Sequence, residues 1–441
     1  LYYVNDKPHL GSSYTTIICD ALSRYKKLEG YEVNFITGVD EHGQKIQRTA
    51  ELNSISPKEH CDNISSKYKE LWKELNISNT SYIRTTSELH KEIVNSFFHK
   101  INDSGDIYIG KQTGWYCVGC EEYKDNKENK DNLNKPICKI HNTNLEWRNE
   151  ENLFFRLSKY QKQIESLVNS ENFIIPNTRK NEVVNFVSQG LNDFSISRIN
   201  LDWGIPVPGY TNHTFYVWFD ALLGYLSGLY LKRGYTKISD CINLGWPATC
   251  HIIGKDILRF HAVYWPAMLI SAELPIPKSI VGHGFLTREG QKMGKSLGNV
   301  LDPYKMIEDY GSDSIRWYLL KDISFNSDGD FQQRRFIELT NNDLANTIGN
   351  LLNRTVSMSR KWFNNKLPDI KLSDVKGHQL EQINLSTIDK YKKSMNIYDL
   401  KTASESILDL AIHTNKYLND IAPWILIKDK SKLYQVSIEI Y

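Results

Sequence analysis

Three cysteines and one histidine form two close pairs with the spacing of a metal site. Cys117 and Cys120 enclose two residues, and after seventeen further residues Cys138 and His141 repeat that spacing. Three thiolates and one imidazole suit tetrahedral Zn²⁺ and leave no coordination position open, so we expect a structural ion rather than a catalytic one. The remaining cysteines lack paired spacing and are expected in packed positions: Cys19, Cys61, Cys241 and Cys250.

A phosphate site is predicted at residues 8–12, where a Pro-His-Leu-Gly-Ser turn separates a short apolar stretch from a helical pattern. At the start of a helix, backbone N–H groups and the helix dipole favour a phosphate group. The His9 imidazole can donate a hydrogen bond to charge developing on the α-phosphate of ATP, and Gly11 lets a ribose or an adenine approach the backbone. A histidine in a turn is often incidental, so this segment needs a second signal.

The second signal is the loop at residues 290–296, whose two lysines, Lys292 and Lys295, can clamp a pyrophosphate leaving group. A loop with lysines at this spacing is by itself usually a solvated surface. The histidine turn follows the first predicted strand and the lysine loop follows the last one. Their order along the chain therefore matters more than either segment alone.

The elements that position these residues are those of a parallel α/β sheet. Residues 1–4 and 33–37 are predicted as strands, with a helix between them that ends near Gly30, where a C-cap glycine belongs. In such sheets ligands bind beyond the carboxyl ends of the strands. The helix is predicted from apolar residues at three- and four-residue spacing: Tyr14, Ile17, Ile18, Ala21, Leu22, Tyr25 and Leu28.

The strand and helix pattern is interrupted and then resumes. Residues 106–150 are polar, contain the paired cysteines and lack a helical period, so we predict an inserted small domain. Strands are then predicted at residues 214–218, 250–253 and 279–281, and helices at residues 219–230 and 255–272. After about residue 331 the strand signals end, and an amphipathic pattern predicts a helical bundle: Leu400, Ala403, Ile407, Ala411, Thr414 and Leu418.

Length and composition limit the classes of protein. With 441 residues the chain exceeds one ordinary domain of about 100–200 residues. It contains 40% hydrophobic and 24% charged residues and no long uncharged apolar run, which argues against a membrane protein. A net charge of +2 indicates no strongly basic nucleic-acid-binding domain, so any RNA contact must be local. Seven cysteines without a disulfide framework favour a reducing compartment.

The histidine turn and the lysine loop are similar to the HIGH and KMSKS signatures of the class I aminoacyl-tRNA synthetases. The chain departs from them at Ser12, where a second histidine is expected, and at Gly294, where a serine is expected. Ser12 still offers a hydroxyl donor, and Gly294 keeps both lysines in a more flexible loop.

Further segments, spread over nearly the whole chain, resemble the methionyl-tRNA synthetase family: Tyr2-Tyr3-Val4-Asn5, Gly38-Val39-Asp40-Glu41-His42-Gly43, Trp203-Gly204-Ile205-Pro206, Tyr216-Val217-Trp218-Phe219-Asp220-Ala221 and Gly254-Lys255-Asp256-Ile257.

This resemblance implies a fold and an activity. The fold is an α/β Rossmann-like catalytic domain with a parallel sheet and an inserted zinc-binding knuckle, followed by an all-α helical anticodon-binding bundle that is truncated. The activity is that of a methionine–tRNA ligase, which forms methionyl-adenylate from methionine and ATP and transfers the methionine to tRNA(Met). Mg²⁺ is expected to travel with ATP, and Zn²⁺ to be structural.

The resemblance also implies which residues meet each partner. An apolar slot with aromatic edges suits a thioether, and a carboxylate suits the substrate ammonium. The methionine-binding residues are Leu1, Tyr3, Asp40, Trp218, Ala221, Tyr225, Ile257 and His261. The catalytic residues are His9, Ser12, Lys292 and Lys295, and the ATP-binding residues are His9, Gly11, Lys255, Asp256, Lys292 and Lys295. The anticodon-binding residues are Asn350, Arg354 and Trp424, with Trp424 stacking on a base.

The predicted domains follow these assignments. Residues 1–105 and 151–285 form the two halves of the catalytic domain, and residues 106–150 form the knuckle between them. Residues 286–330 carry the lysine loop and a stem-contact region, and residues 331–441 form the anticodon-binding bundle. The chain opens within a strand, without Met, and stops within a helical pattern, so we expect both ends to be incomplete. The cytoplasm is the expected compartment, with the matrix of a mitochondrion or plastid as the alternative.

Other functions fit the sequence less well. Leucyl, isoleucyl and valyl synthetases carry an editing insertion of about 100–200 residues, and this chain has no such stretch. Cysteinyl synthetases hold zinc around the active-site sheet rather than in one inserted knuckle. A catalytically silent tRNA-binding protein is a second hypothesis, motivated by Ser12 and Gly294. Methionine-dependent ATP–pyrophosphate exchange distinguishes the two hypotheses.

Overall fold

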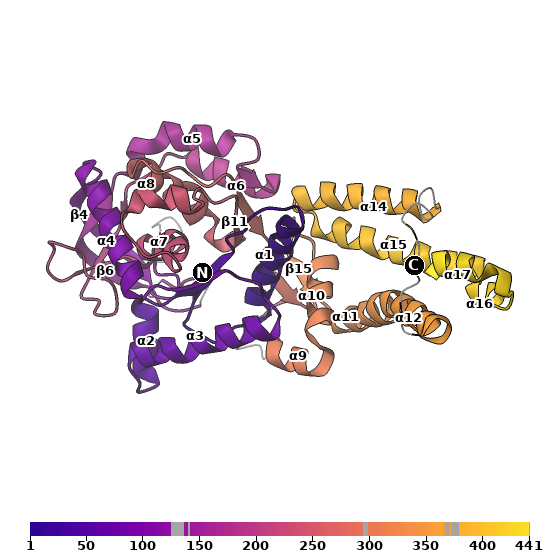
Figure 1. The fold of residues 1–441 in the computed structure, drawn as a ribbon. Helices are drawn as coiled ribbons and strands as arrows, with labels where there is room; N and C mark the ends of the chain where they lie inside the picture. The colour runs from indigo at the N-terminus through magenta and orange to yellow at the C-terminus, as the bar shows by residue number, and fades with distance from the viewer. Residues whose placement is uncertain are drawn as a thin grey trace. The chain divides into compact units, whose positions relative to one another are not determined.

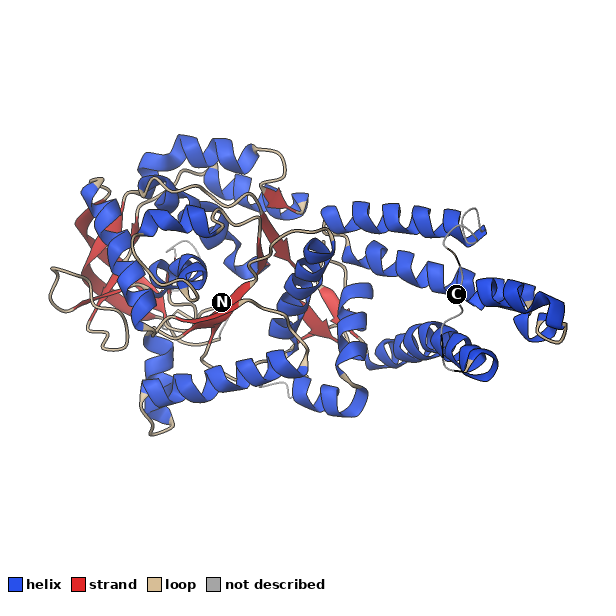
Figure 2. Cartoon of the chain, viewed as in Figure 1, coloured by secondary structure: helices blue, strands red, loops and turns tan. Residues whose placement is uncertain are grey.

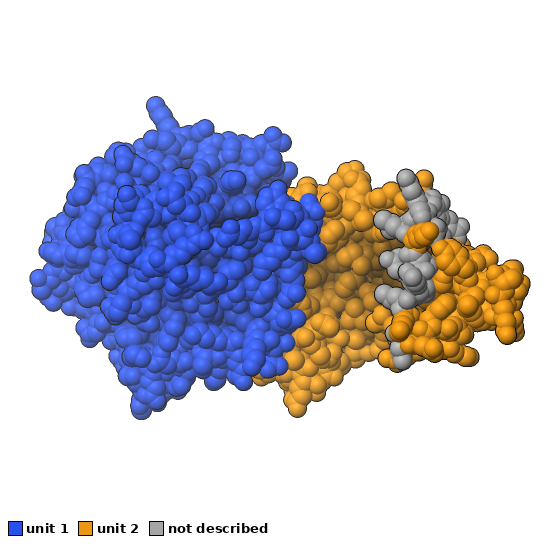
Figure 3. All heavy atoms as spheres, viewed as in Figure 1, with its two compact units in different colours: residues 1–283 blue, residues 284–441 orange. Residues whose placement is uncertain are grey.

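The computed structural model describes residues 1–124, 136–139, 142–293, 299–364, 366, 371 and 379–440. The chain divides into two compact units, Leu1–His283 and Gly284–Tyr441, which Figure 3 colours separately. Helices predominate, and most of the described strands are short, with two longer ones at Ile107–Cys117 and Glu146–Phe155 (Figure 2). Among the described residues, no helix combines the length and the apolar composition needed to cross a membrane.

The first unit contains two three-stranded parallel sheets. One has the order β1 (Tyr2–Tyr3), β2 (Ile36–Asp40), β3 (Ser81–Arg84), and the other has the order β11 (His251–Gly254), β12 (Ile280–His283), β7 (Ile174–Ile175). In the first sheet Tyr3 is the register partner of Asp40, and in the second Gly254 is the partner of His283. The expected α/β fold with parallel strands is confirmed. Its ligand edge carries Asp40, Gly254 and His283 at the ends of their strands.

Eight α-helices surround these sheets in the described part of the first unit (Figure 1): α1 (Leu10–Leu28), α2 (Gln44–Leu52), α3 (Pro57–Glu74), α4 (Glu88–Asp103), α5 (Gln161–Asn169), α6 (Asn177–Val187), α7 (Val217–Tyr230) and α8 (Trp265–Ser271). Shorter helical segments are η2 (Leu157–Tyr160), η3 (Ile238–Leu244), η4 (Lys255–Ile257) and the π-helical turn η5 (Phe260–Tyr264). The predicted first helix is confirmed, and Gly30 lies just beyond its end with φ 86°.

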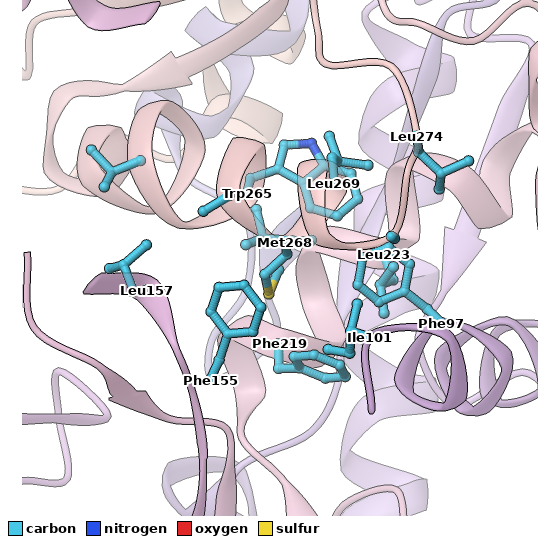
Figure 4. Packing of buried hydrophobic residues seen from close by; sticks show 14 of the residues in the cluster. Phe97, Ile101, Phe155, Leu157, Phe219, Leu223, Trp265, Met268, Leu269 and Leu274 are labelled. Atoms are coloured by element: carbon cyan, nitrogen blue, oxygen red, sulfur yellow. The ribbon is translucent and has the colours of Figure 1, made fainter. Parts of the chain in front are cut away.

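A large hydrophobic core fixes α7, the helix that carries much of the predicted methionine site. α7 is apolar around most of its circumference, which is the pattern of a buried helix. Its Phe219 ring meets Phe97 of α4 edge-on, with centroids 6.1 Å apart. Figure 4 shows the packing of this core, in which the labelled residues are Phe97, Ile101, Phe155, Leu157, Phe219, Leu223, Trp265, Met268, Leu269 and Leu274.

Two strand predictions are wrong at their boundaries. The strand predicted at residues 214–218 is β10 (His213–Phe215), and Val217 and Trp218 instead begin α7. A run of β-branched and aromatic residues does not distinguish a buried strand from a buried helix. The strand predicted at residues 33–37 is β2 (Ile36–Asp40), because pairing with β3 starts only at Ile36. The single helix predicted at residues 255–272 is divided among η4, η5 and α8.

The inserted segment contributes β4, β5 and the start of β6 to an antiparallel sheet with the order β5-β4-β6-β8, in which β8 comes from the chain after the insertion. Its strands are β4 (Ile107–Cys117), β5 (Glu122–Lys124), β6 (Glu146–Phe155) and β8 (Phe194–Ser195). β4 pairs with β6 from Ile107 opposite Phe155 to Tyr116 opposite Glu146. A neighbouring two-stranded sheet joins β9 (Ser197–Ile199) to β10. Cys117 is the last residue of β4, and Cys120 lies in the turn that follows it, before β5.

The second unit begins with a small sheet and continues as helices. The sheet has the order β14 (Gln291–Lys292), β13 (Leu286–Arg288), β15 (Gly329–Phe331). Among the described residues after Phe331 there is no strand, which confirms the predicted helical region. The helices are α9 (Pro303–Tyr310), α10 (Ser312–Lys321), α11 (Gln333–Leu339), the π-helix η7 (Thr340–Gly349), α12 (Asn350–Phe363), α14 (Gln379–Asn396), α15 (Leu400–Ile421), α16 (Pro423–Leu426), η8 (Lys430–Lys432) and α17 (Leu433–Ile440).

Candidate active site and cysteine cluster

His9 caps the N-terminus of α1 with its side chain. Its Nδ1 accepts a hydrogen bond from the Gly11 N–H at 3.0 Å, so the neutral ring carries its proton on Nε2. Ser12 Oγ accepts from the His9 N–H at 3.1 Å and donates to the His9 carbonyl at 2.7 Å, which completes a capping box. A Cβ on Gly11 would lie 2.9 Å from His9 Cε1, so only glycine allows this ring position. The exposed imidazole is thus held in one tautomer by the start of α1.

The carboxyl ends of β11 and β12 lie beside α1. His283, at the end of β12, shares a hydrogen bond of 2.7 Å between its Nε2 and the Oγ1 of Thr15 in α1. At the end of β11, Gly254 is followed in η4 by Lys255 and Asp256. A Cβ on Gly254 would lie 2.6 Å from Asp256 Oδ1, so this carboxylate folds back over the strand end. The structure therefore brings the predicted ATP residues of η4 to the edge at which α1 starts.

Leu1 directly precedes β1, Tyr3 lies in β1, and Asp40 ends β2, the strand that packs against α7. Tyr3 lies beside Asp40 through the β1–β2 register. Leu1 packs against α7 closely, because a Cβ on Gly224 would lie only 2.2 Å from Leu1 Cδ1. Ala221, one turn earlier on α7, is buried. Four of the eight predicted methionine residues are thereby gathered at the junction of the first sheet and α7.

The other four predicted methionine residues form a connected wall. Trp218 stacks on Phe260, with ring centroids 4.0 Å apart and planes inclined by 7°. The Tyr225 hydroxyl lies 2.7 Å from His261 Nε2, and His261 Nδ1 lies 2.9 Å from the Ile257 carbonyl. Because a carbonyl can only accept, Nδ1 carries the proton and Tyr225 donates to Nε2. Burial lowers the pKa of His261 to about 4, so this wall is uncharged at neutral pH.

Asp40 is a buried acid beside Tyr3. It is 8% exposed, and among the described residues no donor lies within hydrogen-bonding distance of its Oδ1. Burial, and next the nearby Asp220 carboxylate, raise the pKa of Asp40 well above its ordinary value. Buried polar atoms in folded proteins nearly always have a hydrogen-bond partner. The Oδ1 atom therefore suits the cationic group of a ligand.

A buried histidine–aspartate–histidine network was not predicted from the sequence. Asp220 of α7 lies 2.6 Å from His42 Nδ1 through Oδ2 and 2.5 Å from His90 Nε2 through Oδ1. Burial alone would raise the pKa of Asp220, but the charges and hydrogen bonds of the two histidines lower it to about 2. The network ties the loop after β2 to α7, next to Asp40. A signal was present, since an acidic residue within the apolar sequence of α7 needs a buried partner.

Three of the four predicted zinc ligands lie together. The sulfur atoms of Cys117, Cys120 and Cys138 are all within 4.8 Å of one another, and the Cys120 and Cys138 sulfurs are 3.6 Å apart. The Cys120 N–H also donates to Cys117 Sγ at 3.4 Å. Zinc–sulfur bonds of about 2.3 Å in a tetrahedral site separate sulfurs by about 3.8 Å, so this group could hold zinc. His141 lies outside the described residues.

The predicted lysine loop belongs to the second unit and is described only at its start. β13 and β14 are joined by a tight turn in which Gly290 has φ 75°. Asp330 Oδ1 holds this turn by accepting from the Gly290 N–H at 2.8 Å and from Thr287 Oγ1 at 2.7 Å. The backbone of Lys292 lies in β14. Its side chain, and residues 294–298 with Lys295, lie outside the described residues.

Two of the predicted anticodon residues are in contact within the second unit. The Arg354 guanidinium carbon lies 5.3 Å from the centroid of the Trp424 indole. Arg354 also donates to Asn419 Oδ1 at 2.8 Å and to Asn415 Oδ1 at 3.3 Å, so α15 fixes its direction. Trp424 is 40% exposed in α16, and Asn350 is exposed one turn before Arg354 on α12. The indole therefore offers surface to a ligand while an arginine steadies it.

Comparisons with known proteins agree with this geometry. The family described as tRNA synthetases class I (M) matches residues 1–130 and 124–356. The methionine–tRNA ligase of Synechocystis is 52% identical to this chain, over 98% of the chain and 81% of the relative. The chloroplastic/mitochondrial methionine–tRNA ligase of Arabidopsis thaliana is 47% identical, over 97% of the chain and 69% of the relative. The solved structure of Mycobacterium tuberculosis methionyl-tRNA synthetase in complex with methionyl-adenylate matches with a TM-score of 0.92 and 35% identity, over 100% of this chain and 87% of that one.

The resemblance of the complete fold extends over both parallel sheets, the cysteine-containing insertion and the helical region, and this combination defines a class I aminoacyl-tRNA synthetase. About half of the residues are identical to those of two methionine–tRNA ligases over nearly the whole chain, which identifies the family within this class. The chain belongs to the methionine–tRNA ligase family.

Proposed function

We propose that this chain activates L-methionine with ATP and transfers it to tRNA(Met) at the site between α1, α7 and the carboxyl ends of β2, β11 and β12. The observation that carries the proposal is the buried Asp40 carboxylate, which lacks a partner for Oδ1 among the described residues and lies near Tyr225 of the uncharged aromatic wall. An α-amino acid with an apolar side chain matches this arrangement. Its ammonium pairs with Asp40, and its side chain enters the slot.

The methionine thioether is assigned to the wall formed by Trp218, Tyr225, Ile257 and His261. A polarizable sulfur interacts favourably with aromatic edges. The hydrogen bond from Tyr225 to His261 fixes both rings, and the neutral imidazole presents no charge to the side chain. Leu1 and Ala221 complete the apolar lining. Tyr3 closes the slot next to the substrate ammonium.

In adenylate formation the protein mainly has to position methionine and ATP, and it forms no covalent bond with either substrate. A methionine carboxylate oxygen attacks the α-phosphorus of ATP, the bond to the β-phosphate oxygen breaks, and pyrophosphate leaves. The tRNA 3′ hydroxyl then attacks the carbonyl carbon of the adenylate, and AMP leaves. His9 stabilises charge on the α-phosphate, and Lys292 and Lys295 stabilise the leaving pyrophosphate.

The remaining ATP residues act around this reaction. Asp256 accepts from ribose hydroxyls, Lys255 contributes positive charge, and Gly11 preserves the position of His9. Ser12 acts through His9, because its hydroxyl is engaged with the His9 backbone on both sides. Mg²⁺ enters with the ATP phosphates.

Methionine-dependent ATP–pyrophosphate exchange, compared with exchange supported by each other proteinogenic amino acid, tests the proposal. Exchange with another amino acid would overturn it, and no exchange at all would favour a tRNA-binding protein without activity.

We further propose that Cys117, Cys120, Cys138 and His141 hold one structural Zn²⁺ per chain. Replacing Cys120 by serine is expected to reduce bound zinc from about one per chain to well below half, because a structural site binds its metal with about 10–16 kcal/mol only when all ligands are present. Metal analysis of the purified protein gives the stoichiometry. Cys241→Ser, a buried cysteine outside the cluster, is the control and should keep its zinc. A parent protein whose cluster thiols react freely with a thiol reagent would contradict the site.

The helical region is proposed to read the tRNA anticodon, with Trp424 stacking on a base and Asn350 and Arg354 meeting base edges. Trp424→Ala is expected to lower kcat/KM for tRNA charging by about tenfold, since one base–aromatic stack contributes ~1–3 kcal/mol. Methionine-dependent exchange without tRNA should stay unchanged. Trp424→Phe keeps an aromatic face and should recover most of the loss. Equal losses in both reactions would indicate that Trp424 only supports the fold of the helical region.

The compartment follows from the family rather than from the site. We propose that the chain serves translation either in the cytoplasm or in an organelle. Bacterial relatives support the first compartment, and the chloroplastic/mitochondrial name of the Arabidopsis relative supports the second. Fractionation of source cells with an antibody to this chain distinguishes the two.

A further inference from the structure

Glu121 is a buried acid that directly follows the cysteine cluster. It is 5% exposed and comes after Cys120, in the turn between β4 and β5. Its backbone has φ 55°, a left-handed conformation that is uncommon for a residue with a side chain. The side chain of Glu121 extends toward Tyr3 of β1 and the start of α2. A residue held in this way is expected to serve its contacts rather than the turn itself.

The Glu121 carboxylate accepts three hydrogen bonds. Its Oε1 accepts from the Tyr3 hydroxyl at 3.1 Å and from the Lys45 N–H at 2.8 Å. Its Oε2 accepts from the Tyr116 hydroxyl at 2.6 Å. Tyr116 lies in β4 next to Cys117, so this bond keeps the acid attached to the metal-binding hairpin. The other two bonds reach the parallel sheet and α2.

The Lys45 bond fills a gap at the start of α2. The N-cap of this helix is Gly43, which has no side chain to accept from the first N–H groups. Lys45 is the second residue of α2, and its N–H finds the Glu121 carboxylate instead. A negative charge at a helix N-terminus also interacts favourably with the helix dipole. Glu121 therefore caps α2 from a position 76 residues away in the sequence.

Gly43 packs closely against the Tyr3 hydroxyl. A Cβ on Gly43 would lie 2.7 Å from Tyr3 Oη and 3.0 Å from Glu121 Oε1, so Gly43 forms the wall against which both atoms rest. Tyr3 in turn lies beside Asp40 in the sheet register. A short chain of contacts thus runs from Cys120 through Glu121 to Tyr3 and the edge of the amino acid pocket.

We propose that Glu121 is a positioning residue that couples metal binding at the cysteine cluster to the shape of the methionine pocket, by holding Tyr3 and the start of α2. This inference rests on the proposed function, because it takes Tyr3 as part of the methionine site. Metal loss would release the turn that carries Glu121. Tyr3 would then lose its acceptor, and affinity for methionine would fall before the sheet itself was disturbed.

Glu121→Ala tests the coupling in the zinc-loaded chain. The KM for methionine in ATP–pyrophosphate exchange should rise about tenfold, because two buried hydroxyls and a helix N–H lose their acceptor, while the KM for ATP and the zinc content stay at the parent values. Glu121→Gln keeps one acceptor oxygen and should recover part of the loss. Glu122→Ala is the matched control, since this neighbouring acid contacts Lys124 at the surface and should behave as the parent does.

A binding measurement without ATP separates coupling from simple structural support. Titration of methionine alone, followed by intrinsic tryptophan fluorescence, should give a Kd about tenfold weaker for chelator-stripped parent than for zinc-loaded parent. Stripping should not weaken Glu121→Ala further, nor Tyr3→Phe, which lacks only the hydroxyl that Glu121 accepts from.

Three results would overturn the inference: parent-like methionine affinity in folded, zinc-loaded Glu121→Ala, an equal effect of stripping on parent and on Tyr3→Phe, or no effect of stripping on the parent. Tyr3→Phe keeps the test decisive if Glu121→Ala does not fold. A zinc-loaded parent that activates a different amino acid would instead refute the proposed function, so the two failures are distinguishable.

Discussion

Replacement of His9 by alanine is expected to lower methionine-dependent ATP–pyrophosphate exchange by about 10²-fold or more. A preorganised donor aimed at developing charge contributes ~2.7–4 kcal/mol to a transition state. The capping geometry supplies that preorganisation, because the bond from the Gly11 N–H leaves the imidazole proton on Nε2. Steady-state exchange with varied methionine and ATP measures the effect, which should be mainly on kcat.

The same substitution also removes a helix cap, which typically costs about 1 kcal/mol of stability. His9→Asn separates the two roles, since an asparagine side chain is a good N-cap but carries no imidazole. Its melting temperature should return to that of the parent while exchange stays low. Recovery of exchange in His9→Asn would mean that His9 contributes only to the start of α1.

Asp40→Asn is expected to reduce kcat/KM for methionine by about 10²-fold or more. Truncating one partner of a buried charge pair costs ~3 kcal/mol or more, and the substrate ammonium would lose its counter-charge. Exchange kinetics at varied methionine concentration should show the decrease in kcat/KM for methionine, while the KM for ATP stays unchanged. A fall of only a few-fold would assign the ammonium to another group.

Asp40→Asn should lower activity without lowering the thermal stability of the protein. The pKa of Asp40 is raised in the folded protein by burial and by the nearby Asp220 carboxylate, so at neutral pH this group opposes folding. The cost decreases as the pH falls below the raised pKa and is lost at the ordinary pKa of an aspartate. The amide removes the cost, and the melting temperature at neutral pH should be equal or higher. In the parent, kcat/KM for methionine should decline as the pH falls through the same raised pKa, because protonation removes the charge that binds the ammonium.

The elements near the chemistry could be predicted where local sequence decides structure. Pro8, the apolar spacing after it and Gly30 specify the beginning and the end of α1, and the structure confirms both. The spacing of the paired cysteines predicted that their sulfur atoms lie together, because two ligands on one tight turn are already close in space. The order of strand, turn, helix and strand likewise predicted the parallel sheet.

Contacts across long sequence separations could not be predicted in this way. His42 and Asp220 are 178 residues apart, and Glu121 and Tyr3 are 118 apart, with no repeated spacing to connect them. A buried acid indicates that a partner exists but does not identify it. The helical state of Val217 was also decided by tertiary packing, since α7 is enclosed by the core on nearly all sides and residue preference alone favoured a strand.

The π-helical turn at Phe260–Tyr264 makes the pocket sensitive to the number of residues as well as to their types. A π turn holds one residue more than an α-helical turn, and each residue of an α-helix rotates the next side chain by about 100°. Deleting one residue there would let the segment return to α-helical geometry and turn either His261 or the buried Trp265 away from its present neighbours. Libraries of point substitutions keep the residue count and never sample such a change. Single-residue deletions and insertions between Ile257 and Trp265 are therefore a separate route to altered amino acid specificity.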